Sequence, residues 1–167
     1  KKAIKKGNLT TLNCPEEVFL AEKLLSMHPW AGKVKFARTG GEANAMAIRI
    51  ARSASERENV AFCGYHGWHD WYLAANLKNK KILDEHLIPD LDPIGVPSSL
   101  RNTSFGFQYN NINQLRRLVD KENIGVIKME VSRSIQPNIK FLRKVRELAT
   151  KKNIVLIFDE CTSGFRQ

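Results

Sequence analysis

Residues 154–160 read IVLIFDE, an uninterrupted apolar run that two acids follow at once. A run of this length without alternation predicts a strand that is buried on both faces of a parallel sheet. Such a strand requires a crossover helix and neighbouring strands to cover it. Because the sequence ends at Gln167, shortly after this strand, we interpret the chain as part of a larger domain.

Helix-like and strand-like patterns alternate along the rest of the chain. We predict helices over residues 15–28, 39–53, 112–121 and 139–152, and strands over residues 34–37, 60–63, 105–108, 124–129 and 154–158. We expect the proline-interrupted stretch 64–102 to be irregular. The alternation predicts an α/β fold with a mostly parallel sheet flanked by helices. We divide the chain into an N-terminal helical segment, residues 1–33, and an incomplete α/β domain, residues 34–167.

The composition is that of an ordinary folded domain. The 167 residues are 43% hydrophobic and 26% charged, which supplies enough apolar surface for a core. No apolar run reaches the roughly 18 residues of a membrane-spanning helix, and the start of the chain lacks the apolar stretch of a signal peptide. Cys14, Cys63 and Cys161 lie far apart and do not suggest a disulfide framework. These features predict a cytoplasmic protein.

The chain carries 27 Lys and Arg residues against 17 Asp and Glu residues, a net charge of +10. Such an excess is compatible with a polyanionic partner such as a nucleic acid. The basic residues are scattered over the polar positions of the predicted helices, however, and no aromatic residues interleave with them as a nucleic-acid platform requires. Solvated helix faces are therefore the preferred interpretation, and we predict neither a nucleic-acid nor a membrane partner.

The turn Thr39-Gly40-Gly41-Glu42 lies between a predicted strand and a predicted helix. Thr39 and Glu42 have the spacing of a capping box. The two glycines allow backbone N–H groups to face an anion at the positive end of the helix. Considered alone, the turn is better explained as a well-capped helix without a ligand, since strand–Gly–Gly–helix turns are common in α/β domains. The pattern Gly-x-Gly-x-x-Gly is absent, which disfavours an ordinary dinucleotide site.

The run GYHGWHDWY, residues 64–72, follows a predicted strand and concentrates histidines and aromatic residues in one loop. Loops at the carboxyl ends of parallel strands are where such sheets bind ligands. One interpretation is a slot for a planar ligand, with Tyr65 or Trp68 stacking on its face. Another is a packed aromatic turn, and a third is a metal site made by His66, His69 and Asp70. We favour the slot, and the metal site least, because the ligand set matches no zinc pattern.

Two acids end two of the predicted strands. Asp159 follows the apolar run 154–158, and Glu130 follows residues 124–129. Both positions lie at the carboxyl edge of a parallel sheet. A partly buried carboxylate requires a partner, and a cationic ligand atom would be one. A capping or loop acid is the alternative interpretation.

Together these segments resemble the class III (fold type I) pyridoxal-phosphate-dependent aminotransferases, a family that includes the glutamate-1-semialdehyde 2,1-aminomutases. The segments that carry the resemblance are VKFARTGGEANAMAIRIAR, GYHGWHDWY and VLIFDECTSGFR. The resemblance implies that residues 34–167 are an incomplete cofactor-binding large domain of this fold. The positions that it assigns to the cofactor pyridoxal 5'-phosphate (PLP) are Thr39, Gly40, Gly41, Tyr65, His66, Glu130 and Asp159.

The resemblance also implies a role for each of these groups. Backbone amides of the turn 39–41 would hold the phosphate, and Tyr65 would lie on the pyridine ring. Asp159 would pair with the ring nitrogen, which makes the ring a better electron sink. His66 would lie close behind, near that nitrogen, and Glu130 would support the site.

The implied activity is transfer of an amino group between a small-molecule donor and an aldehyde or keto acceptor, in a homodimer. The family's Schiff-base lysine would lie beyond this chain, so no residue here is assigned as catalytic and the chain alone is expected to be inactive. Glutamate-1-semialdehyde 2,1-aminomutase is an alternative activity, and a phosphate- or nucleotide-binding module without catalysis is an alternative of another class.

Several positions depart from the family pattern. Gly41 replaces a threonine, which removes a hydroxyl group that could reach the phosphate. Val131 stands where proline is usual, and residues 132–135 do not resemble the aminomutase sequence. The GYHGWHDWY run and the region of Arg133 are more similar to the aminomutase-like transferases of surface-polysaccharide pathways.

Overall fold

The computed structural model describes residues 14–86, 88–132 and 135–165. The chain divides into two compact units, residues 1–37 and residues 38–167. Among the described residues, no helix is long and apolar enough to cross a membrane.

The first unit contains helix α2, Pro15–Met27, which confirms the predicted helix. Pro15 occupies the start of the helix, where its missing N–H costs nothing, and acidic residues follow in the first turn. The predicted strand over residues 34–37 is wrong, since this stretch has no regular structure. A strand exists only where a neighbour completes its ladder, and none of the described strands pairs with it.

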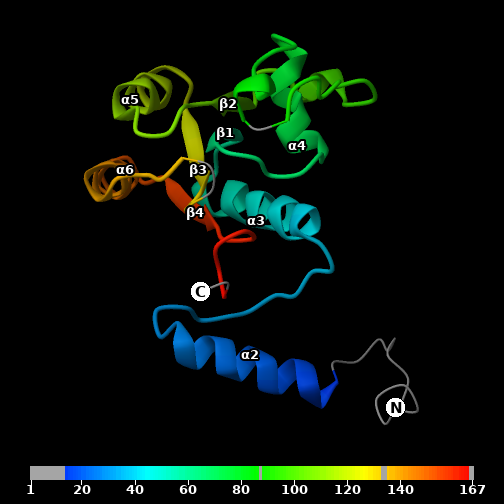
Figure 1. Ribbon diagram of the computed structural model, residues 1–167, viewed down its shortest axis with the longest axis vertical. Helices are drawn as coiled ribbons and strands as arrows, with labels where there is room; N and C mark the ends of the chain where they lie inside the picture. The colour runs from blue at the N-terminus through cyan, green and yellow to red at the C-terminus, as the bar shows by residue number, and fades with distance from the viewer. Residues whose placement is uncertain (1–13, 87, 133–134, 166–167) are drawn as a thin grey trace. The chain divides into compact units, whose positions relative to one another are not determined.

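The second unit is built on a parallel sheet of four strands in the order β2-β1-β3-β4 (Figure 1). The strands are β1 (Asn59–Cys63), β2 (Ser104–Gly106), β3 (Ile124–Glu130) and β4 (Val155–Asp159). The α/β class with a parallel sheet is thereby confirmed. All seven residues of β3 are buried, as expected for a central strand that helices cover on both faces. The prediction that the apolar run 154–158 is buried on both faces is wrong, because β4 lies at the edge of the described sheet and its Phe158 is 44% exposed.

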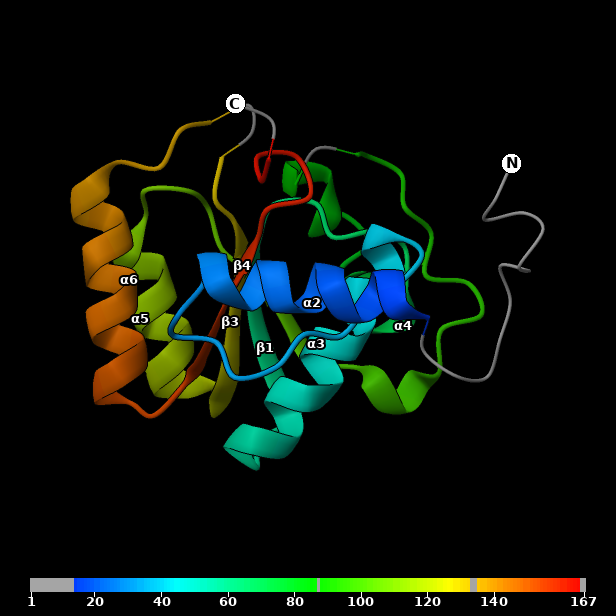
Figure 2. The same cartoon turned by 90° about the horizontal axis from the view of Figure 1, so that it is seen from below.

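Helices cover both faces of this sheet. Helix α3 (Gly40–Ser55) packs on one face, and helices α5 (Ile112–Lys121) and α6 (Ile139–Lys151) pack on the other (Figure 2). The spacing of the buried residues explains this packing, because Phe141, Val145 and Ala149 recur every four residues and form one stripe of α6. The two faces of β3 alternate accordingly. Val126 belongs to the core under α3, and Ile127 belongs to the core under α5 and α6.

The expectation that residues 64–102 are irregular is only partly correct. They contain α4 (Asp70–Leu73) and three short 3₁₀ helices, η1 (Ala74–Leu77), η2 (Leu83–His86) and η3 (Ser98–Leu100). Each is a single turn, too short to show a helical period in the sequence. They form because their apolar residues are buried, with Tyr72 and Leu83 fully so.

Candidate functional site

A cavity of about 490 Å³ lies where the carboxyl ends of the strands meet the start of α3. It is lined by Thr39, Gly40, Gly41, Glu42, Asn44, Tyr65, His66, Gly67, Trp68, His69, Glu130, Asp159, Cys161 and Thr162. All seven positions that the sequence assigned to a cofactor are among them. The structure therefore brings these residues to one place, although four separate segments of the chain contribute them.

The first turn of α3 is held by the predicted capping box. The Thr39 hydroxyl accepts a hydrogen bond from the Glu42 N–H at 3.2 Å, and the Glu42 carboxylate accepts one from the Thr39 N–H at 3.2 Å. This cap occupies the N–H of Glu42. The N–H groups of Gly40 and Gly41 belong to the same first turn, at the positive end of the helix dipole. The turn thus has the form of an anion site.

Asp159 lies at the edge of the cavity, with its side chain only 3% exposed. Its Oδ2 accepts a hydrogen bond from His66 Nδ1 at 2.8 Å, and its Oδ1 accepts one from the Cys161 N–H at 3.1 Å. Lys128 Nζ lies 3.3 Å from Oδ2. Burial raises the pKa of the Asp159 carboxyl, but the His66 hydrogen bond and the charge of Lys128 outweigh it and hold the pKa below its usual range. Asp159 is therefore an ionised carboxylate.

His66 is fixed between two acceptors. Nδ1 faces Asp159, and Nε2 lies 3.1 Å from the carbonyl oxygen of Cys63. Burial lowers the pKa of the His66 ring, and the hydrogen bond to Asp159 acts in the opposite direction. With the side chain fully buried, His66 is placed to orient Asp159 rather than to contact solvent.

Lys128 is a site residue that the sequence analysis missed. Its side chain is 1% exposed and forms an ion pair with Asp159. Burial lowers the pKa of Lys128, and the charge of Asp159 opposes that change. A lysine inside an otherwise apolar strand could have indicated a buried ion pair. The sequence did not identify its partner, because Asp159 is separated from β3 by α6.

Glu130 supports the turn that carries Tyr65. Its Oε2 accepts a hydrogen bond from the Tyr65 N–H at 3.0 Å. Gly64, just before, has a φ of +101°, and a Cβ there would lie 2.5 Å from the same oxygen. The Tyr72 hydroxyl donates to the Gly64 carbonyl at 3.0 Å, and the Tyr65 and Tyr72 rings meet edge to face at 6.0 Å. These contacts fix the position of the Tyr65 ring at the cavity.

The loop that follows Tyr65 closes over the start of α3. The Asn44 side chain donates to the His66 carbonyl at 3.3 Å. Trp68 lines the cavity but is 71% exposed, so Tyr65 is the better supported of the two stacking candidates. Among the described residues, no group of three or more His, Cys, Asp or Glu side chains could hold a metal ion.

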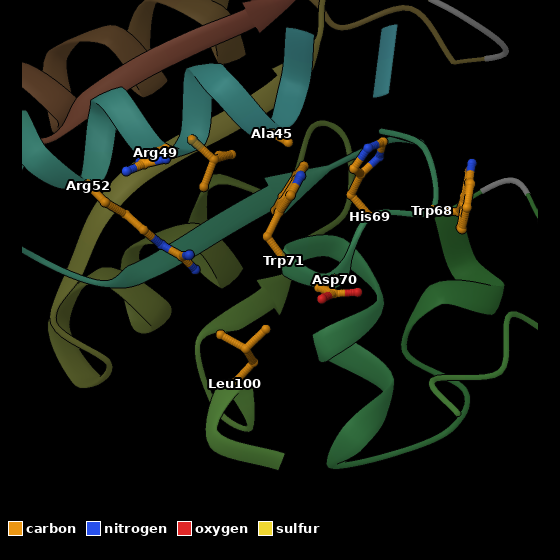
Figure 3. Close-up of a pocket in the computed structure, with 9 residues that line it drawn as sticks. Ala45, Arg49, Arg52, Trp68, His69, Asp70, Trp71 and Leu100 are labelled. Carbon is orange, nitrogen blue, oxygen red and sulfur yellow. The ribbon is translucent and has the colours of Figure 1, made fainter. Parts of the chain in front are cut away.

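A second cavity of about 470 Å³ adjoins this loop between α3, α4 and η3 (Figure 3). It is lined by Ala45, Ile48, Arg49, Arg52, Trp68, His69, Asp70, Trp71 and Leu100. None of the seven predicted positions is in this cavity. Figure 3 shows Arg52 extending from α3 at the left of the view, with His69 right of centre and Trp68 at the right.

Part of the sequence resemblance falls outside the described residues. Arg133 and Ser134, which separate this chain from the aminomutase pattern, are not described, and neither is Arg166 at the end of the last motif.

Comparisons with known proteins agree on one family. The family model described as aminotransferase class-III matches residues 2–167. A glutamate-1-semialdehyde 2,1-aminomutase from Sulfurisphaera tokodaii is 37% identical over 169 residues, which cover 98% of this chain and 39% of that protein. A 3-aminobutyryl-CoA aminotransferase from Cloacimonas acidaminovorans is 31% identical over 169 residues, which cover 96% of this chain and 37% of that protein.

Solved structures share the fold. An omega-transaminase from Sphaerobacter thermophilus matches with a TM-score of 0.78 at 25% identity, over 96% of this chain and 39% of that one. A transaminase with PLP bound matches with a TM-score of 0.77 at 24% identity, over 96% of this chain and 38% of that one. The chain spans well under half the length of the relatives that it matches.

Proposed function

This chain belongs to the class III aminotransferases, and from that premise we propose that it is part of a PLP-dependent enzyme that transfers an amino group between a small-molecule amino donor and an aldehyde or keto acceptor. The observation that carries the proposal is the convergence of the 39–41 turn, Tyr65 and Asp159 on one cavity. A helix N-terminus, an aromatic ring and a buried carboxylate match the three parts of the cofactor, which are its phosphate, its planar ring and its ring nitrogen.

The donor set fits this cofactor. Asp159 is ionised and buried, so it favours a proton on a ring nitrogen placed against it. When bound, PLP supplies the electron sink that stabilises the negative charge left by the departing substrate Cα proton. Asp159 contributes by holding the nitrogen protonated, and His66 keeps its carboxylate in place. Tyr65, anchored through Glu130, is positioned to cover one face of the ring.

We further propose that residues 34–167 form part of the large domain, and that the Schiff-base lysine, which also moves the Cα proton, lies outside this chain. A homodimer with its sites at the subunit interface and a cytoplasmic location complete the proposal. The family membership supports the homodimer. The 39% share of the aminomutase that this chain covers supports a lysine outside the chain.

The aminomutase activity is a second candidate, because the relative at 37% identity carries that name. In that reaction the amino group moves within one molecule. Val131 and the sequence of residues 132–135 depart from the aminomutase pattern, which favours intermolecular transfer to a different acceptor. The two activities differ in one requirement, since a mutase needs no external amino donor.

The test uses protein expressed from its complete reading frame. We expect PLP to produce a visible absorption band, borohydride to fix it covalently to a lysine, and an amino donor to bleach it without an acceptor present. Replacing Asp159 with Asn in a Lys128→Met background, to avoid stranding the lysine charge, should lower turnover about 10²-fold or more. The Lys128→Met protein is the matched control.

An absent band, together with tight binding of a nucleotide, would replace the proposal by the phosphate-binding module. Near-normal turnover of the Asp159→Asn, Lys128→Met protein would remove the role of Asp159. Conversion of glutamate 1-semialdehyde without any added donor would select the aminomutase.

A further inference from the structure

The space next to Gly41 is filled by the imidazole of His69. A Cβ built on Gly41 would lie 2.6 Å from His69 Cε1 and 2.8 Å from His69 Nδ1. Separations this short do not occur between real Cβ atoms and their neighbours, so any larger residue at position 41 would displace the ring. The His69 ring can therefore occupy this position only because residue 41 has no side chain.

His69 Nδ1 is a buried polar atom without a hydrogen-bond partner among the described residues. The residue is the N-cap of α4, but its side chain makes no capping bond. Its carbonyl oxygen accepts hydrogen bonds from the Tyr72 N–H at 2.9 Å and the Leu73 N–H at 3.2 Å. An unpaired buried nitrogen costs about 1–3 kcal/mol unless a ligand satisfies it. An anion bound by the N–H groups at the start of α3 would supply an acceptor for this nitrogen in the tautomer that carries a proton on Nδ1.

We propose that His69 replaces the side chain absent at position 41 and donates a hydrogen bond from Nδ1 to the phosphate held at the start of α3. This inference rests on the proposed function, since the phosphate is that of PLP. A threonine at position 41 would place its hydroxyl one bond beyond Cβ, in the region that Nδ1 now occupies. One donor is thereby exchanged for another that comes from a different segment.

The backbone around His69 fits this role. Gly67 has a φ of +93°, and a Cβ on it would lie 3.3 Å from the Gly41 Cα. A glycine adopts this φ without strain and allows the loop to approach α3 closely, whereas a Cβ at this position would force a shift of the neighbouring backbone. The Trp68 ring lies 5.8 Å from the His69 ring at an interplanar angle of 39°. The loop therefore holds the imidazole against the turn.

The chemistry requires the tautomer or charge state with a proton on Nδ1. A donor to a phosphate oxygen forms a charge-assisted hydrogen bond, which is stronger than one between neutral groups. No covalent change is involved. His69 is thus a binding and positioning residue, and its contribution is confined to the phosphate end of the ligand.

The test compares PLP with pyridoxal, which has the same ring and aldehyde but no phosphate. In protein from the complete reading frame, His69→Leu should weaken PLP binding about tenfold or more and leave pyridoxal binding unchanged. His69→Asn keeps a donor near the Nδ1 position and should recover most of the affinity. Asp70→Asn, which alters the adjacent residue of the loop, is the matched control and should change neither.

Exchange of the pair supplies a second measurement. Gly41→Thr alone should weaken PLP binding because its Cβ meets the ring, and Gly41→Thr with His69→Ala should restore the preference for PLP over pyridoxal. In the unaltered protein, the ¹⁵N resonance of His69 Nδ1 should shift on addition of PLP and not of pyridoxal.

Equal weakening of both ligands in His69→Leu, or an unshifted resonance with PLP bound, would overturn the inference and leave the proposed function standing. Failure of the unaltered protein to bind PLP at all would overturn both. If the double variant Gly41→Thr, His69→Ala binds PLP as weakly as Gly41→Thr alone, the threonine hydroxyl does not replace the His69 imidazole, and this too would contradict the inference.

Discussion

Removing the carboxylate of Asp159 should leave the buried Lys128 ammonium without its counter-ion. The Lys128 ammonium is 3.3 Å from Asp159 Oδ2, and the two side chains are 1% and 3% exposed. Asp159→Asn keeps an oxygen that accepts the His66 hydrogen bond but removes the charge that balances Lys128. Breaking one side of a buried ion pair costs about 3–5 kcal/mol.

The cost has a ceiling, because Lys128 can lose its proton instead. Neutralising a lysine with an ordinary pKa of about 10.4 at pH 7 costs about 5 kcal/mol, and this falls by about 1.4 kcal/mol for each pH unit. In the variant the folded-state pKa of Lys128 is depressed, so the unfolded chain binds more protons and stability rises with pH. We therefore expect a loss of about 3–5 kcal/mol at pH 7 that shrinks to about 2 kcal/mol at pH 9.

Urea unfolding of the unaltered protein, Asp159→Asn, Lys128→Met and the double variant measures this directly. Lys128→Met alone should cost less than Asp159→Asn, because Asp159 keeps its bonds from His66 and Cys161. The double variant should be more stable than Asp159→Asn. A loss below about 1 kcal/mol, a loss that is constant from pH 7 to pH 9, or a double variant no better than Asp159→Asn would refute the reasoning.

Three further predictions concern the support of the site. Burial lowers the pKa of His86 to about 4. The stability that depends on neutral His86 is therefore complete above pH 6.5, and about 3 kcal/mol of unfolding free energy in urea is lost as the pH falls from 6.5 to 4. If His86→Gln shows the same loss of stability over this pH range as the unaltered protein, this prediction is contradicted. Thr39→Ala should lower the unfolding free energy by about 0.5–2 kcal/mol through loss of the cap to Glu42, and Thr39→Ser should restore it. Gly64→Ala should cost about 1 kcal/mol or more in the same assay, because φ is +101° and the new Cβ meets Glu130; an unaltered midpoint would show that the turn adapts.

The parts of the site predicted from sequence are those that local rules determine. The Thr39 and Glu42 spacing specifies a capping box wherever a helix starts, and the structure contains it. Glu130 and Asp159 end apolar runs, and the carboxyl ends of parallel strands share one edge, so their meeting follows from the fold class. In the sheet they are paired in register.

The parts that were missed depend on contacts between distant segments. Lys128 was placed in the predicted strand 124–129 without a role, because its burial and its partner follow from the pairing of β3 with β4. His69 was considered only as a metal ligand, since its approach to Gly41 depends on the path of an irregular loop. The strand expected at residues 34–37 failed for a related reason, as an apolar pattern does not identify a pairing neighbour.

The concentration of charge at this edge of the sheet is better explained by ligand binding than by stability. Burying an ion pair costs about as much desolvation free energy as the attraction returns, and apolar replacements are often as stable. Yet Lys128, Glu130 and Asp159 all lie on the sheet face that α3 covers. The side chains of Lys128 and Asp159 are 1% and 3% exposed, and Glu130 is 3% exposed as a whole residue. A fold that needed only packing would place residues such as Val126 at these positions as well. The charges lie where the strands end at the cavity, so a ligand that uses an ionised Asp159 accounts for their cost.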